Sequence, residues 1–290
     1  MTGAAAGLAA AFNTPLGGIV FAVEELARIH IRFIRTALFT AVIIAGLTAQ
    51  GLLGPYLYLG YPNVTGLHSS IFFGVAATAV AASLAGAIMS KLILRLMKWR
   101  STLKSIFKII LFVIASGLLI SLIAYFFDAA VLGSGKSLMT RTLFSVDKEV
   151  TWQTVVARLV GTTVSFTSGA AGGVFAPALA AGASIGGFVS SLFHVTNADT
   201  NILILCGMVA FLTGVTRTPF TSAILVLEMT DRHSVIFHLM IAAMIANLAA
   251  MMVEEHSFYE VLKKQYLQEL RNNEVSDNID SGPILDSKTS

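Results

Sequence analysis

The sequence predicts an all-α polytopic membrane protein, and three observations lead to that fold class. Apolar residues make up 56% of the 290 residues and charged residues only 12%, against about 25% charged in an average soluble domain. The mean hydropathy is +0.79, and several long segments carry no charged residue. So much apolar surface cannot be buried inside one water-soluble globule. Disordered chains, nucleic-acid-binding proteins and ordinary soluble enzymes are therefore excluded.

A helix needs roughly 20 mostly apolar residues to cross a bilayer, and three segments in the first half of the chain meet this requirement. Thr36–Leu59 and Ser69–Ser90 are free of charged residues, and Ile106–Phe127 carries only Lys108, near its start. Each of the three is predicted to span the membrane.

The second half of the chain is apolar but interrupted. Between Thr151 and Asn197 the only Lys, Arg, Asp or Glu is Arg158, and Ser168–Pro177 breaks the run with glycines and a proline. Two helices rather than one are therefore predicted there. The remaining candidates are Asn201–Thr216 and Pro219–Leu227, each too short to span alone, then Val235–Val253, and an amphipathic helix over Phe258–Arg271. The polar residues after Arg271 are predicted to be unstructured.

Basic residues predict the orientation of the spans. Arg28, Arg32 and Arg35 precede the first span and a basic cluster over residues 91–108 separates the next two, whereas the loop Gly60–His68 has no Lys or Arg. By the positive-inside rule the basic clusters lie in the cytoplasm and the loop outside. These basic cytoplasmic loops explain the net charge of +3. No nucleic-acid partner is therefore needed to explain it. We expect a multi-pass protein of the cell membrane, the cytoplasmic membrane of a prokaryote.

One motif occurs twice, at opposite ends of the chain. Thr14-Pro15 and Thr218-Pro219 each open a short apolar helix, and each is followed by a glutamate nine residues after the proline, Glu24 and Glu228. Chance recurrence is one explanation. The other is a transporter of two structural repeats, whose broken helices meet near the bilayer midplane at the substrate. Since the first copy lies at the extreme N-terminus, we expect most of a first repeat to be missing from this sequence.

The interruption Ser168–Pro177 is the predicted chemical centre. The first N–H groups of a helix that starts here lack intrahelical acceptors, and they are costly in lipid when unpaired. An anion can accept them, helped by the positive end of the helix dipole. A site without Lys or Arg can also release the ion, as conduction requires. The alternative is that Gly169, Gly173, Gly182 and Gly186 only permit close helix packing, and the residues alone favour neither interpretation.

Three motifs in the expected order resemble the CLC family of chloride channels and chloride/proton exchangers. They are AAAGLAAAFNTPLGGIVFAVEEL, SGAAGGVFAP and TPFTSAILVLEMTD, and the second contains GxFxP, the anion-filter motif of that family. The resemblance covers residues 3 to about 268. It implies a helical bundle of two inverted repeats with broken and re-entrant helices, assembled as a homodimer with one pore in each subunit.

The resemblance also divides the chain. It implies a transmembrane domain over residues 1–270, made of the end of an incomplete first repeat (1–60), a second repeat (66–256) and a helix at the cytoplasmic end (257–270). Residues 271–290 are predicted to be a disordered polar tail.

Roles follow from the resemblance residue by residue. Val174 and Phe175 would donate backbone N–H groups to chloride within the filter motif that Gly173 and Pro177 flank, and the hydroxyl of Tyr259 would close the inner side of the site. Glu25 resembles the internal proton-transfer glutamate of the exchangers, whereas Glu24 and Glu228 are predicted to be structural.

No catalytic residue, metal site or cofactor is expected. The histidines have no metal-binding spacing, the single Cys206 excludes a CxxC module, and no Walker loop, GxSxG or HExxH motif occurs. The expected partners are chloride, protons and the lipid membrane.

The implied function is chloride transport, with chloride/proton antiport favoured because the Glu25 position is usually apolar in family members that only conduct chloride. Two further family motifs, GSGIP with a serine chloride ligand and GREGP with an external gating glutamate, do not occur in the sequence and are expected to precede residue 1. A passive chloride channel and a truncated chain that transports nothing are the alternatives. The choice between chloride and nitrate is open, because it depends on the missing serine loop.

Overall fold

The computed structural model describes residues 2–26, 31–54, 56–65, 68, 70–103, 105–127, 129–146, 148–170, 172–193 and 195–280, without the side chains of residues 26, 31–35, 269 and 272–280. Every regular element in these ranges is helical. The α-helices are α1 (Thr2–Phe12), α2 (Pro15–Phe21), α3 (Ile31–Leu53), α4 (Ile71–Ser101), α5 (Ile106–Phe126), α6 (Lys136–Phe144), α7 (Trp152–Thr167), α8 (Phe175–Phe193), α9 (Asn197–Thr216), α10 (Pro219–Thr230), α11 (Ile236–Met251) and α12 (Phe258–Asp280). The short elements are the π-helix η1 (Ala22–Leu26) and the 3-10 helices η2 (Ala129–Val131) and η3 (His233–Val235).

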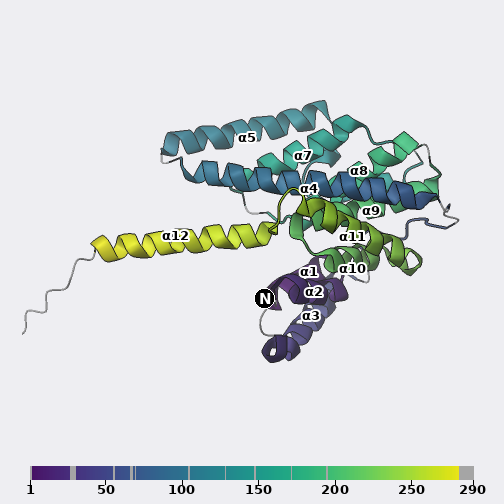
Figure 1. Cartoon of the computed structure of the whole chain (residues 1–290), viewed down its shortest axis with the longest axis horizontal. Coiled ribbons are helices and arrows are strands. Elements are labelled where there is room, and N and C mark those ends of the chain that lie inside the picture. Colours follow the sequence, from purple (N-terminus) through teal and green to yellow (C-terminus); the bar gives the residue numbers. More distant parts are fainter. Residues whose placement is uncertain are drawn as a thin grey trace, which may run out of the picture.

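Six of these helices are long and apolar enough to cross a membrane, namely α4, α5, α8, α9, the end of α3 and η3 with α11. The predicted all-α, multi-pass fold class is therefore confirmed. Helix α9 lies at the centre, where every residue from Asp199 to Thr216 is buried, and α8, α4 and α11 pack around it. Helix α5 lies on the outside and exposes most of its apolar side chains, and α1, α2 and α3 form a separate lobe (Figure 1).

Close approach of α8 and α9 is made possible by glycine. A Cβ atom at Gly182 would overlap the carbonyl oxygen of Gly207, and one at Gly186 would overlap that of Leu203. Gly182 and Gly186 therefore serve helix packing, as the alternative interpretation predicted. A Cβ atom at Gly173 would meet nothing within 4 Å, so packing does not explain the glycine next to the predicted anion site.

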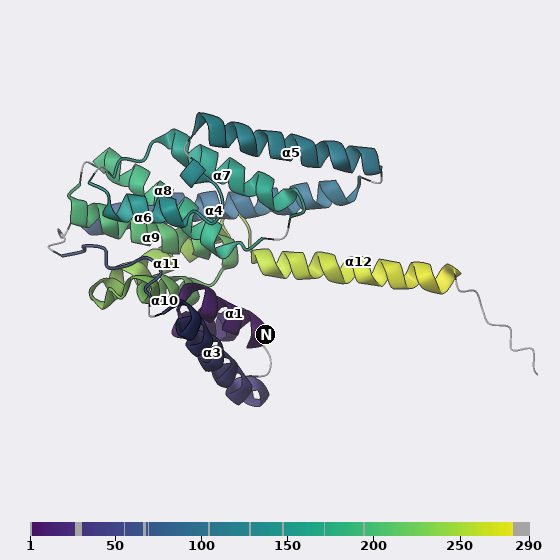
Figure 2. The ribbon, with the colours of Figure 1, turned by 180° about the vertical axis from the view of Figure 1, so that it is seen from behind.

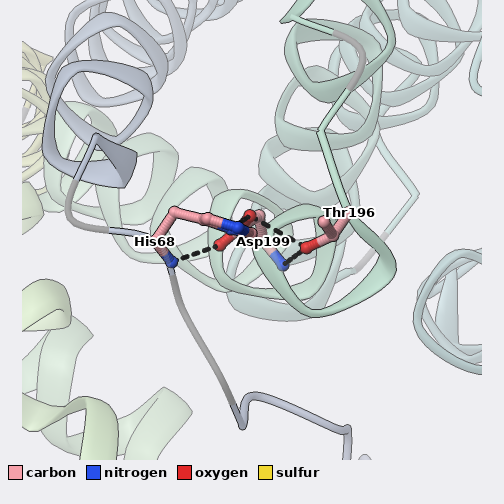
Figure 3. Close-up of polar contacts among 3 residues, drawn as sticks. All are labelled: His68, Thr196 and Asp199. Atoms are coloured by element: carbon pink, nitrogen blue, oxygen red, sulfur yellow. Dashed lines mark hydrogen bonds and ion pairs between the residues drawn. The ribbon is translucent and has the colours of Figure 1, made fainter.

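The start of α9 corrects one prediction. We expected Asn201–Thr216 to be too short to span alone, but the helix begins at Asn197 and reaches spanning length. Its first turn contains the buried Asp199, whose carboxylate accepts hydrogen bonds from the Thr196 hydroxyl (2.8 Å) and the His68 backbone N–H (3.3 Å) and lies 2.8 Å from His68 Nδ1 (Figure 3). These partners allow a carboxylate inside the helical bundle.

Three other boundaries differ from the predicted ones. Helix α3 ends at Leu53 rather than residue 59, and α4 continues to Ser101 through the basic cluster. Helix α12 extends to Asp280, into the segment predicted to be unstructured, while residues 281–290 lie outside the described part of the chain. Helix α6 was not predicted. The orientation argument from Arg28, Arg32 and Arg35 rests on side chains that are not described.

The basic cluster and the loop without Lys or Arg lie at opposite ends of the bundle. Helix α12 leaves the bundle on the same side as the connection between α4 and α5, where the basic cluster lies, and both views agree on this (Figures 1 and 2). The connection between α3 and α4, which holds the loop without Lys or Arg, runs on the opposite side (Figure 1).

The two Thr-Pro segments share one backbone conformation. Thr14 has φ −127° and ψ 75°, and Thr218 has φ −119° and ψ 77°. The residues before them, Asn13 and Arg217, are both left-handed, with φ of 55° and 61°. Three dihedral angles thus agree within about 10° between the two copies, which argues against a chance recurrence of Thr-Pro.

The glutamates of the two copies bind each other's helices. The Glu228 carboxylate accepts the backbone N–H groups of Leu16 (3.0 Å) and Gly17 (2.6 Å) at the start of α2. The Glu24 carboxylate accepts those of Phe220 (3.2 Å) and Thr221 (2.7 Å) at the start of α10. Each glutamate thus caps the half-helix of the other copy, and we call this arrangement the reciprocal clamp.

Candidate anion-binding site

All six residues singled out from the sequence line one cavity of about 1260 Å³: Glu25, Gly173, Val174, Phe175, Pro177 and Tyr259. The wall is completed by residues of α1, by the connection around η2, by α7 and by the first turns of α12. Positions far apart in the chain therefore meet around one space.

The N-terminus of α8 forms one side of this cavity. The carbonyl oxygen of Val174 accepts the N–H of Ala178 (3.0 Å), so Val174 opens the helix. Val174 and Phe175 are buried. Within the described part of the chain, no hydrogen bond is donated by the backbone N–H of either residue. These two amides are therefore available to an anion in the cavity, where the helix dipole also favours negative charge.

Aromatic rings surround the entrance to this helix end. The Phe21 ring meets that of Phe175 edge to face at 5.2 Å between centroids and that of Tyr259 at 6.2 Å. The Tyr259 ring stacks on Phe175 at 6.5 Å and packs edge to face against Phe258 at 5.7 Å. Burial, and after it the charge of Glu25, raise the pKa of Tyr259. Its hydroxyl is thus kept protonated and able to donate to an anion.

Glu25 approaches the cavity from the π-helix η1. Glu24 and Glu25 are neighbours in that element but face different partners, since Glu24 belongs to the reciprocal clamp and Glu25 Oε1 accepts a hydrogen bond from the Ser257 hydroxyl (3.0 Å). π-Helical turns are frequent at functional sites. Here the π turn gives two adjacent carboxylates separate tasks.

Arg158 of α7 is a residue of the cavity wall to which the sequence gave no role. It is buried and donates to the carbonyl oxygens of Val131 (2.6 Å), Gly133 (3.0 Å) and Pro177 (3.4 Å), so it joins the η2 connection to the first turn of α8. Arg158 is the only charged residue between Thr151 and Asn197, and this isolation could have marked it as a functional or structural residue. Ser257 and Phe21 were also missed. Ser257 and Glu260 have the spacing of a capping box, but no sequence pattern points to the contact of Ser257 with Glu25.

The chemistry available to the cavity is that of anion and proton binding. Lys263 and Lys264 lie at its α12 side together with Glu260. No group of three His, Cys, Asp or Glu side chains within the described ranges could hold a metal ion.

The chain is similar to one family over most of its length. Residues 1–251 match the family described as "Voltage gated chloride channel". The H(+)/Cl(-) exchange transporter ClcA of Klebsiella pneumoniae is 29% identical over 275 residues, which cover 92% of this chain and 58% of that protein. The ClcA of Salmonella typhimurium is 31% identical, covering 90% of this chain and 57% of that protein. The chain thus spans a little over half the length of these relatives.

Two solved structures share the fold. A slow cyanobacterial Cl-/H+ antiporter superposes with a TM-score of 0.77 at 22% identity, covering 92% of this chain and 64% of the antiporter. A CLC-type fluoride/proton antiporter superposes with a TM-score of 0.74 at 20% identity, covering 89% of this chain and 63% of that structure.

Proposed function

Because this chain belongs to the CLC family of voltage-gated chloride channels, a family of transporters rather than enzymes, we propose that it acts in chloride/proton antiport. The observation that carries the proposal is the shared cavity, since an anion-binding helix end and a carboxylate that can carry a proton line the same space. A passive channel would need the first of these but not the second.

Chloride would be held by backbone groups. Within the described residues the N–H groups of Val174 and Phe175 donate to no protein acceptor, and the protonated Tyr259 hydroxyl lies on the same cavity. Neutral donors bind an anion without the strong attraction of a full positive charge, so the ion can leave again. The Arg158 guanidinium is occupied by three carbonyl groups and holds the helix start in place.

Protons would be carried by Glu25. The Ser257 hydroxyl donates to Glu25 Oε1, which favours the ionised form. The place of Glu25 beside the cavity would let a proton pass toward the anion path. We further propose that the protein lies in the cytoplasmic membrane of a prokaryote and forms a homodimer. The exposed apolar side chains Leu16 and Phe220 beside the reciprocal clamp support a contact between subunits there.

The test is simultaneous recording of chloride efflux and proton uptake in vesicles that contain the whole gene product. We expect a chloride gradient to drive protons in the opposite direction. Glu25→Gln should suppress proton movement while chloride still moves, because glutamine has a similar size but cannot carry the proton. The exposed Glu255 lies on the same side of the molecule, and Glu255→Gln is the matched control. Uncoupled chloride flux in the wild-type protein would support the channel instead, and absence of flux would support a non-transporting chain.

A further inference from the structure

The Ser257 hydroxyl takes part in two hydrogen bonds that join different parts of the site. It donates to Glu25 Oε1 (3.0 Å) and accepts the backbone N–H of Glu260 (3.1 Å). The Glu260 carboxylate in turn accepts the backbone N–H of Ser257 (3.3 Å). The last two bonds form a capping box, which fixes the N-terminus of a helix. One buried hydroxyl thus belongs both to the cap of α12 and to the first contact of Glu25.

The segment before α12 also has anchors in the bundle. Arg217 donates to the carbonyl oxygens of Ala250 (2.7 Å) and Glu254 (2.6 Å), and Lys91 donates to that of Val253 (3.1 Å). The Phe258 ring is buried against Phe166 at 5.8 Å. These contacts hold the chain near the site but do not involve Glu25. The Ser257 bond is therefore a direct route by which Glu25 acts on α12.

Tyr259 lies two residues beyond Ser257, in the first turn of α12, and lines the cavity. After the first turns of α12 the side chains become largely exposed, including Tyr266 and Leu270. The position of Tyr259 therefore depends on the cap and on Phe258, in addition to the ring contacts with Phe21 and Phe175.

We propose that Ser257 is a positioning residue that transmits the protonation state of Glu25 to the α12 turn carrying Tyr259. This rests on the proposed exchange function. When Glu25 is ionised, the Ser257 O–H donates a charge-assisted hydrogen bond, which is about twice as strong as a neutral one. When Glu25 takes up a proton, that bond becomes neutral and the cap is held less tightly. The inner side of the anion site then loosens as the proton binds.

Ser257 also acts in the opposite direction. A donor to the ionised carboxylate favours that form, so removing the hydroxyl makes proton uptake by Glu25 easier. In the described part of the chain, the titratable and charged side chains that line the cavity together with Glu25 are Tyr259, Glu260, Lys263 and Lys264 of α12 and Arg158 of α7. They stay in place in all the variants below.

Three substitutions separate the capping role from the contact with Glu25. Ser257→Thr keeps both bonds. Ser257→Asp keeps a good N-cap acceptor but loses the donor and places a second carboxylate beside Glu25. Ser257→Ala loses both bonds. Thr151, whose hydroxyl caps α7 by accepting the N–H of Thr154 (3.4 Å), supplies the control Thr151→Ala, which removes a cap away from Glu25.

The deciding experiment is a double-mutant cycle on the whole gene product, read by amide hydrogen exchange in the first turn of α12. Exchange reports local opening. Glu25→Gln, which imitates the protonated state, should speed exchange there by up to about tenfold, as expected when a charge-assisted hydrogen bond is replaced by a neutral one. In the Ser257→Ala background the same change should have no further effect. Additive effects of the two substitutions would overturn the proposal, and this cycle needs no transport.

The transport readout is the pH at which proton uptake is half-maximal. It should rise by about one unit in Ser257→Ala and Ser257→Asp and stay unchanged in Ser257→Thr and Thr151→Ala. A wild-type profile in Ser257→Asp would mean that the hydroxyl serves only as a cap, and would refute the proposal. If the wild-type protein moves chloride but no protons, the antiport assignment fails, while the exchange cycle still decides the role of Ser257.

Discussion

The reciprocal clamp gives the sharpest test of how the two Thr-Pro copies hold each other. The perturbation is replacement of Glu24 or Glu228 by glutamine, singly and together. Glu228 accepts two backbone N–H groups of α2, and Glu24 accepts two of α10 together with the Thr221 hydroxyl (2.7 Å). Hydrogen bonds to a charged group contribute about 1.5–3 kcal/mol each. A glutamine keeps one accepting oxygen but turns an N–H₂ group toward the second backbone donor.

We therefore expect Glu228→Gln to lower the free energy of unfolding by about 2–3 kcal/mol and Glu24→Gln by roughly 1 kcal/mol more, because Glu24 has the additional hydroxyl partner. The hydrogen bonds from the Leu16 and Phe220 amides are both exposed, which places each loss of stability at the lower end of its range. Both carboxylates secure one contact between α2 and α10. The double variant should lose less than the sum, with a coupling of about 1 kcal/mol.

The assay is unfolding in detergent by increasing sodium dodecyl sulfate, followed by far-ultraviolet circular dichroism. Glu255→Gln, at an exposed glutamate, is the control and should stay within about 0.5 kcal/mol of the wild type. Losses below about 0.5 kcal/mol in both single variants, or strict additivity in the double variant, would refute the view that the two glutamates form one clamp.

Four further predictions concern the site and its frame. Val174→Ile should retain chloride binding in calorimetric titration and Val174→Pro should abolish it, because only the second removes an N–H donor; equal losses would assign the site to side chains. Gly182→Val should prevent the α8–α9 contact and sharply lower the yield of monodisperse protein, whereas Gly117→Ala on α5, where a Cβ atom meets nothing within 4 Å, should be tolerated. Asp199→Asn should cost about 2 kcal/mol in the same unfolding assay, with faster hydrogen exchange around His68; an unchanged midpoint would contradict the role given to that cluster. Burial and the charge of Glu25 raise the pKa of Tyr259, so its phenolate absorbance should emerge at a higher pH than that of the exposed tyrosines, and Tyr259→Phe should remove this last step.

Hydropathy predicted the membrane spans because a helix that crosses a bilayer must be apolar over its whole membrane-embedded length. It did not predict the residues at which the helices end. Helix α4 continues to Ser101 since Lys and Arg are good helix formers and positive charge near a helix C-terminus is favourable. The membrane boundary and the helix boundary thus differ. The start of α9 depends on Asp199 finding His68, a partner distant in sequence. Such a pairing exists only in the folded chain.

The site was predicted by motif rather than by physical pattern. The glycines indicated a helix start with unpaired N–H groups, which left anion binding and helix packing open. The roles of Val174, Phe175, Glu25 and Tyr259 were assigned through the family resemblance, because no periodicity connects positions so far apart. Ser257 shows the limit most clearly. A buried serine before a helix is an ordinary cap in sequence, and only the folded structure shows that its hydroxyl also contacts Glu25.

The neighbouring carboxylates of η1 explain why stability and coupling should depend on each other here. Glu24 binds the start of α10, and so fixes the π turn against the second copy of the Thr-Pro motif. The same turn carries Glu25, whose Ser257 partner follows the end of α11. Because α10 and α11 pack together, the clamp also sets the distance between Glu25 and the cap of α12. Loss of Glu24 should therefore reach the proposed proton coupling only indirectly, through geometry, and leave it largely intact, whereas loss of Glu25 removes the proposed proton site itself.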